Sequence, residues 1–181
     1  MHACIVVSGP PCAGKSGLAT LLAARAGWPL LAKDTYKERV FDRLGAGDRD
    51  WSRRVSGLAW DLLLDEAARL YAAGVCCVLE GNFRDRELER LALLRPAPRY
   101  VEIRACARAE VLLGRYRTRA ASGSRHSGHV DLQALAEIEL EILSGARPAR
   151  DLGGAVLRWD TSDGFDSGLL LAALDVALAP G

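Results

Sequence analysis

Residues 9 to 16 read Gly-Pro-Pro-Cys-Ala-Gly-Lys-Ser, which is a complete G-x-x-x-x-G-K-[ST] pattern. A loop of small residues can wrap tightly enough for several backbone N–H groups to point at one anion. Lys15 adds a compact positive charge suited to terminal phosphates, and the Ser16 hydroxyl suits Mg²⁺. The pattern therefore predicts a site for a nucleoside triphosphate and Mg²⁺. The predicted nucleotide-binding residues are Gly9, Pro10, Pro11, Cys12, Ala13, Gly14, Lys15, Ser16 and Gly17.

Asp34 follows the second apolar run of the chain, residues 28–32, after a single lysine. In an open parallel sheet the ligand lies beyond the carboxyl ends of the strands, so this carboxylate would face the terminal phosphate. A carboxylate there can orient an acceptor hydroxyl and take up its proton during phosphoryl transfer. We predict that Asp34 is the catalytic base. The alternative is a helix cap for a segment that starts at Thr35.

Polar residues also follow the third apolar run, residues 75–79. Glu80 could hold Mg²⁺ through water or bind an acceptor hydroxyl, and Asn82 and Arg84 could recognise polar groups of an acceptor. The alternative is a plain turn before a helix that begins near residue 85. Further positions that could select an acceptor are Lys33, Tyr36, Lys37 and the segment 41–60. Phe41, Trp51 and Trp60 of that segment could form a flat wall for a ring-bearing acceptor, and the alternative is that they are ordinary core residues.

Two arginines after the fourth apolar run are spaced to share one face of a helix. Arg115 and Arg119 stand at i and i+4. A pair of guanidinium groups on a lid would stabilise the charge that develops on the transferred phosphoryl group and would exclude water. The alternative is a solvated basic face. The lid would span about residues 107–131, with a loop of glycine, serine and histidine near its end.

That loop holds His126 and His129, with Asp131 close behind. Two histidines without a further clear ligand more often contact a substrate than a metal, so we favour a lid or acceptor contact for both, with His126 as the candidate for acceptor binding. After the fifth apolar run, residues 155–159, Thr161 and Ser162 could contact a purine. A turn that caps the last helix is the alternative for these two residues.

These residues need a scaffold that brings the ends of several strands together. Five apolar runs alternate with helical patterns, which is typical of a parallel sheet covered by helices on both faces. The expected strands are residues 3–8, 28–32, 75–79, 100–104 and 155–159. The expected helices are about residues 15–26, 35–44, 51–73, 84–94, 107–121, 131–144 and 165–178.

Composition narrows the class of protein. The chain has 181 residues, half of them apolar, so residues 1–181 are expected to form one domain. A net charge of +1 argues against a nucleic-acid partner. The five cysteines lack metal-site spacing. The first apolar run leaves no room for a signal peptide, and no stretch approaches the roughly 20 residues of a membrane span. We expect a cytoplasmic protein without a membrane partner.

Taken together, these segments resemble the small P-loop kinases of the AAA-type ATP-binding group, which is similar to chloramphenicol phosphotransferase and the zeta-toxin kinases. The resemblance rests on the phosphate loop, residues 33–37, 79–83, 115–119, 125–129 and 160–161. It implies an α/β three-layer sandwich with strand order 2-3-1-4-5 and a helical lid. It also implies that Asp34 is the base and that lid arginines include Arg125. Ser127 departs from the pattern, because many relatives carry proline there.

The resemblance implies an ATP- or GTP-dependent, Mg²⁺-requiring kinase that phosphorylates a hydroxyl of a small molecule. By analogy alone, inactivation of an antibiotic is the preferred subclass. A metabolic nucleoside or nucleotide kinase is an alternative, for which Lys33, Lys37 and Arg84 would supply a basic acceptor pocket. A non-catalytic nucleotide-dependent switch is another. The sequence leaves open whether the chain forms a homodimer.

Overall fold

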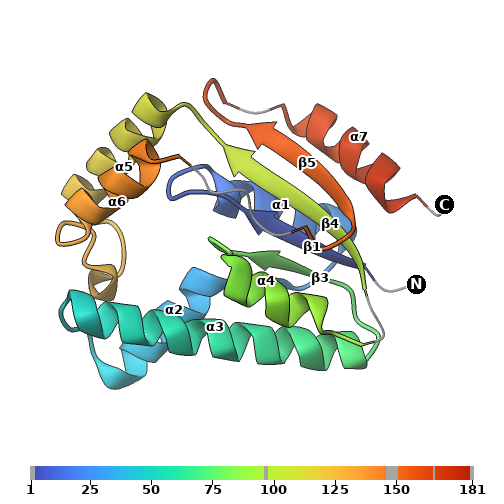
Figure 1. The fold of residues 1–181 in the computed structure, drawn as a ribbon, viewed down its shortest axis with the longest axis horizontal. Coiled ribbons are helices and arrows are strands. Elements are labelled where there is room, and N and C mark those ends of the chain that lie inside the picture. The colour runs from blue at the N-terminus through green and yellow to red at the C-terminus, as the bar shows by residue number, and fades with distance from the viewer. Residues whose placement is uncertain (1–2, 96–97, 146–150, 165, 180–181) are drawn as a thin grey trace.

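A computed structural model describes residues 3–95, 98–145, 151–164 and 166–179 of the chain (Figure 1). The described residues form a parallel sheet of five strands in the order β2-β3-β1-β4-β5. The expected sheet and strand order are therefore confirmed. The strands are β1 (Ala3–Ser8), β2 (Leu30–Ala32), β3 (Cys77–Glu80), β4 (Arg99–Cys106) and β5 (Ala155–Asp160).

The helices of the described residues agree closely with the expected segments. They are α1 (Lys15–Ala26), α2 (Lys33–Leu44), α3 (Arg49–Ala72), α4 (Asp85–Ala92), α5 (Ala109–Ser122), α6 (Leu135–Leu143) and α7 (Ser167–Leu178), with a short 3₁₀ helix, η1 (Ser127–His129). The expected start of the sixth helix at 131 is wrong by four residues. Val130 has φ 49°, a left-handed conformation that ends η1, and residues 131–134 form a turn before α6.

Two apolar cores, one on each face of the sheet, hold the three layers together. One core joins β1 and β4 to leucines of α1 and α7. The other joins β1 and β3 to leucines of α3 and α4. Every residue of β1 is buried, because this central strand is covered on both sides. The expected three-layer arrangement is confirmed, and it leaves the carboxyl edge of the sheet to carry polar residues.

Glycine allows the phosphate loop to leave β1 close to its neighbour. Gly9 has φ 140°, and a Cβ at this position would overlap the carbonyl oxygen of Ala105 at the end of β4. A larger residue would push the loop away from the sheet or force β4 aside. The loop is therefore held directly above the strand ends.

The helices α5 and α6 lie together beside the carboxyl edge of the sheet, and the segment between them reaches toward α2 and α3 (Figure 1). Gly128 in η1 packs so closely on Phe41 of α2 that a Cβ there would overlap the ring. None of the helices in the described part of the chain has the length and apolar character needed to cross a membrane.

Candidate active site

A cavity of about 680 Å³ lies at the carboxyl ends of β1, β2 and β3. The phosphate loop, the start of α2, the amino-terminal half of α3 and the segment from α5 to α6 enclose it. Most of the residues predicted from the sequence line this cavity. They are Pro11, Cys12, Gly14, Lys15, Ser16, Gly17, Lys33, Asp34, Lys37, Glu80, Asn82, Arg84, Arg115, Arg119 and Arg125.

The phosphate loop has the conformation that an anion site requires. Gly14 adopts a left-handed conformation as the N-cap of α1, and no side chain of the described residues caps this helix. Its first N–H groups therefore remain available to a ligand. The Lys15 ammonium donates to the carbonyl oxygen of Pro10 at 2.8 Å. Burial lowers the pKa of Lys15, although Glu80 and Asp34 oppose the shift. A half-buried ammonium beside open N–H groups fits a bound triphosphate.

Ser16 and Glu80 meet beneath the loop. The Ser16 hydroxyl donates to Glu80 Oε2 at 3.4 Å. Burial raises the pKa of Glu80, and the positive charge of Lys15 works against that rise. Mg²⁺ usually takes one or two protein oxygens and completes its shell with phosphate and water. One hydroxyl and one carboxylate at this position fit such an ion. The described residues contain no group of three or more His, Cys, Asp or Glu that could hold a metal alone.

Asp34 lies in the first turn of α2, with 45% of its side chain exposed to the cavity. It is not the helix cap, because Ala32 occupies the N-cap position. Its carboxylate pairs with Arg125 and lies 3.5 Å from the Lys33 ammonium. Burial alone would raise the pKa of Asp34, but Arg125 and Lys33 outweigh it and hold the pKa well below its usual range. The carboxylate is therefore ionised at any physiological pH.

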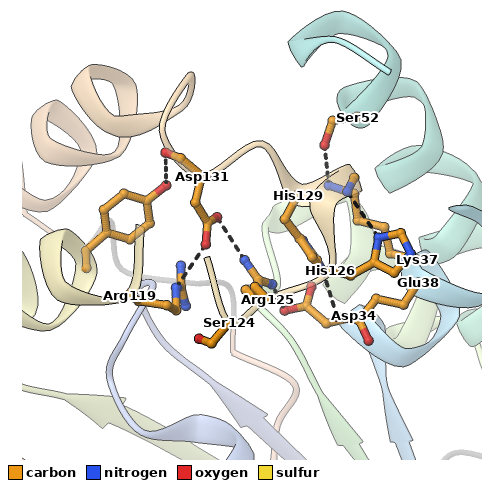
Figure 2. Close-up of polar contacts among 12 residues, drawn as sticks. Asp34, Lys37, Glu38, Ser52, Arg119, Ser124, Arg125, His126, His129 and Asp131 are labelled. Atoms are coloured by element: carbon orange, nitrogen blue, oxygen red, sulfur yellow. Dashed lines mark hydrogen bonds and ion pairs between the residues drawn. The ribbon is translucent and has the colours of Figure 1, made fainter. Parts of the chain in front are cut away.

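A chain of alternating charges crosses the cavity from α2 to α5 (Figure 2). Arg125 binds Asp34 on one side and donates to Asp131 Oδ1 at 3.1 Å on the other. Asp131 Oδ2 then lies 3.2 Å from Arg119 Nε, an ion pair without hydrogen-bond geometry. The Arg119 guanidinium also stacks over the Tyr116 ring, 4.9 Å from its centre. Two arginines of the predicted lid thus lie in the cavity together with Asp34.

Arg115 has a different environment from Arg119. Its guanidinium donates to the carbonyl oxygens of Thr161 at 2.6 Å and of Cys12 at 3.3 Å. Thr161 is buried, and its hydroxyl donates to the carbonyl oxygen of Ala13 at 3.1 Å. Arg115 and Thr161 therefore brace the phosphate loop from the side of β5. Arg115 has only neutral oxygen partners among the described residues, so it keeps an uncompensated charge.

Several predicted contacts are not supported by the geometry. Thr161 and Ser162 do not line the cavity, and neither caps α7, whose cap is Asp166. Ser162 instead accepts a hydrogen bond from the Arg108 N–H at the start of α5, at 2.8 Å. A purine contact through these two side chains is therefore not favoured.

Tyr36 and His126 also lie outside the cavity. Tyr36 lines a separate shallow groove with leucines of α2 and α3. His126 stacks on Phe41 with 5.4 Å between ring centres and accepts from the Gly128 N–H. Of the three aromatic residues predicted to form a wall, only Trp60 is among the cavity's described lining residues.

The far wall of the cavity, opposite the phosphate loop, contains residues of the predicted segment 41–60 and one of the two predicted loop histidines, but the sequence did not reveal the partners of these residues. Arg49 and Arg53 of α3 both bind Glu137 of α6, at 2.8 and 2.9 Å. His129 also lines the cavity and contacts Glu38 Oε1 at 2.9 Å. Burial, followed by the charge of Arg125, lowers the pKa of His129 to about 3, so its ring is neutral.

The chain is similar to one known protein family and to several solved structures. The model of a family described as "AAA domain" matches residues 4–140. A candidate kinase from Chloroflexus aurantiacus J-10-fl is 37% identical, with a TM-score of 0.90 over 98% of this chain and 99% of that one. A sugar kinase from Janibacter sp. HTCC2649 is 18% identical, with a TM-score of 0.59 over 98% of this chain and 95% of that one.

Shikimate kinase from Acinetobacter baumannii, solved with shikimate, is 17% identical, with a TM-score of 0.54 over 98% of this chain and 93% of that one. At such low identity, this likeness and that to the sugar kinase concern the fold alone. None of the curated proteins matches the chain.

Proposed function

This chain belongs to the AAA domain family and has the fold of the small P-loop kinases, and from that premise we propose that it transfers the γ-phosphoryl group of ATP or GTP to a hydroxyl of a small molecule. The family and the fold agree with the expectation from the sequence. One observation carries the proposal: Asp34, Lys15 and Ser16 line the same cavity. Phosphoryl transfer needs these three groups around the terminal phosphate and the acceptor.

Asp34 is proposed to position the acceptor. The acceptor hydroxyl donates a hydrogen bond to the exposed part of this carboxylate. Its oxygen bonds to the γ-phosphorus as the bond to the β–γ bridging oxygen breaks, and its proton leaves through Asp34 to solvent. Because Arg125 and Lys33 hold Asp34 ionised, the carboxylate always offers an acceptor for that hydrogen bond.

The remaining residues neutralise charge and exclude water. Lys15 binds the terminal phosphates, and Arg115 and Arg119 stabilise the charge that spreads over the transferred group. Ser16 and Glu80 would hold Mg²⁺, which supplies further neutralisation of the phosphates when bound. The packing of Gly128 on Phe41 closes the segment between α5 and α6 over the acceptor.

The decisive experiment measures phosphate transfer from ATP and from GTP, with Mg²⁺, to a panel of hydroxyl compounds. Hydroxyl-bearing antibiotics enter the panel because of the resemblance in sequence, and nucleosides, sugars and hydroxy acids enter it because the solved kinases of this fold include a sugar kinase and shikimate kinase. A product is identified by a mass gain of one phosphoryl group.

Asp34→Asn should lower kcat for the responding acceptor by about 10²- to 10⁴-fold while nucleotide still binds. Asp175→Asn is the matched control, because Asp175 is exposed on α7 and pairs only with Arg25 among the described residues. Undiminished transfer by Asp34→Asn would contradict the role of this carboxylate. Binding of nucleotide without transfer to any acceptor would favour a nucleotide-dependent switch.

A further inference from the structure

Lys37 is a buried ammonium group that forms no ion pair with a carboxylate of the described residues. The residue is 4% exposed, lines the cavity and lies one helical turn after Lys33, which is 7% exposed. Its Nζ donates to the Ser52 hydroxyl at 2.8 Å and lies 5.4 Å from the centre of the Phe41 ring, and neither partner carries a charge. Burial, followed by repulsion from Lys33, lowers the pKa of Lys37 to about 7. Buried charges are normally paired, so this position is suited to an anion.

The carboxylates around Lys37 already form ion pairs with other positively charged residues. Within the described residues, three carboxylates pair with five cations of the cavity. Glu137 pairs with Arg49 and Arg53, Asp131 pairs with Arg119 and Arg125, and Asp34 pairs with Lys33 and Arg125. Positive charge therefore exceeds negative charge here even before Lys37 is counted. The whole chain, by contrast, has a net charge of only +1.

A bound triphosphate would not satisfy this excess at Lys37. The Lys15 ammonium donates to the carbonyl oxygen of Pro10 in the phosphate loop, whereas the Lys37 ammonium donates to Ser52 of α3. Figure 2 likewise places Lys37 and Ser52 on the opposite side of Asp34 from Arg119. Lys37 therefore lies away from the phosphate loop, on the side of the cavity that α2 and α3 form.

Resting on the proposed phosphotransferase function, we infer that the acceptor carries an anionic group, a carboxylate or a phosphate, which Lys37 and Arg49 bind while Asp34 holds the hydroxyl. Arg49 can turn to this group because Arg53 also binds Glu137 and remains with it. The acceptors are hydroxy acids or phosphorylated alcohols.

The first test compares matched acceptors that differ only in charge. Glycerol, glycerate and glycerol 3-phosphate form one set, and glucose, gluconate and glucose 6-phosphate form another. The anionic members should have the higher kcat/KM, and the better anion in both sets identifies a carboxylate or a phosphate site. Lys37→Met should raise KM for the anionic acceptors roughly 10- to 100-fold and leave KM for the neutral ones unchanged.

Arg39→Met is the matched control, because Arg39 lies on the same helix but is exposed and outside the cavity. Arg39→Met should change neither the KM for the anionic acceptors nor the KM for the neutral ones. Equal kcat/KM for neutral and anionic acceptors would overturn the inference while leaving the kinase function standing. An equal loss for both classes in Lys37→Met would also overturn it, since the lysine would then have only a structural role.

The second test does not depend on transfer. Calorimetric titration of gluconate, glycerate and glucose 6-phosphate is carried out at pH 8 in two buffers of different ionisation enthalpy. An anion raises the pKa of Lys37, so binding should take up protons in the natural protein and in Arg39→Met, but not in Lys37→Met. If these acids bind but no hydroxyl compound is phosphorylated, the proposed function fails and the anion site stands. If none of them binds, the inference is overturned.

Discussion

The ion pair between Arg125 and Asp34 defines what this carboxylate can do. A carboxylate with a lowered pKa is a weak base, but it remains a strong hydrogen-bond acceptor at every physiological pH. In the loose transition state of phosphoryl transfer, orientation of the hydroxyl matters more than early removal of its proton. Asp34 is therefore suited to orient an acceptor, and Arg125 sets the pH range in which it can do so.

Replacement of Arg125 by methionine should move the acid limb of the pH profile of kcat/KM to higher pH. In the natural protein the pKa of Asp34 lies so low that this limb is absent from the usual range. Arg125 is the largest of the charges that lower this pKa, so the pKa rises when Arg125 is removed. Arg117→Met is the control, because Arg117 is exposed and pairs with Glu139. If the acid limb of Arg125→Met begins at the same pH as that of the natural protein, the effect of Arg125 on the pKa of Asp34 is contradicted. The size of kcat/KM does not enter this comparison.

Lys37 should make the stability of the protein depend on pH. Its pKa is about 7 in the folded chain, against about 10.4 for a free lysine. Between these values the unfolded chain binds more protons, so the free energy of unfolding rises with pH. The Tm of the natural protein should therefore rise relative to that of Lys37→Met from pH 7 to pH 9. If Tm changes with pH in the same way in both proteins, the pKa of Lys37 is not lowered in the folded chain.

At the scale of single elements, η1 is the part of the lid whose position matters most. A Cβ at Gly128 would overlap the Phe41 ring, so Gly128→Ala should displace η1 and, with it, Arg125. We expect a lower kcat at nearly unchanged nucleotide affinity. Gly114→Ala is a control on α5, where a Cβ meets no atom within 4 Å. It should keep full activity and raise stability by about 0.5–1 kcal/mol. Equal activity of both variants would contradict a closing role for η1.

The elements could be predicted because their patterns are local. Apolar runs and leucine spacing predict the strands and helices, and parallel strands bring their ends to one edge, which is why Asp34 and Glu80 were found. The expected start of α2 is two residues late, because the helix begins at Lys33. Within the helix, Tyr36 lies about 100° around the axis from Lys37 and lines the separate groove, a difference that proximity in sequence does not reveal.

The contacts within the far wall could not be predicted, because they depend on how helices pack. Arg49 and Glu137 are 88 residues apart, and Arg125 and Asp34 are 91 residues apart. No local pattern in an arginine-rich chain distinguishes Arg49 from an arginine on a solvated helix face, and Arg125 is expected only through the family resemblance. The same holds for Thr161, whose polarity suggested contact with a ligand although its hydroxyl is directed at the phosphate loop.

At the scale of the whole molecule, the end of β5 supports a loop that follows β1. Thr161→Val keeps the shape of the side chain but removes the hydroxyl that donates to the Ala13 carbonyl and accepts from Arg115. With about 1 kcal/mol for one such hydrogen bond, the Kd for ATP should rise roughly fivefold. Thr118→Val, an exposed substitution on α5, should not change it. An unchanged Kd in Thr161→Val, measured by calorimetry, would contradict the bracing role.

The hydrogen bond between Thr161 and Ala13 also bears on the order in which a ribosome completes this protein. The two residues are 148 positions apart in the chain. The loop that binds nucleotide is synthesised early. The hydrogen bond from Thr161 that supports it can form only after almost all of the later strands and helices have been synthesised. We therefore expect the emerging polypeptide to hold ATP weakly until Thr161 has left the exit tunnel. Capture of nucleotide would then be among the last events of biosynthesis, although its residues are among the first to be translated.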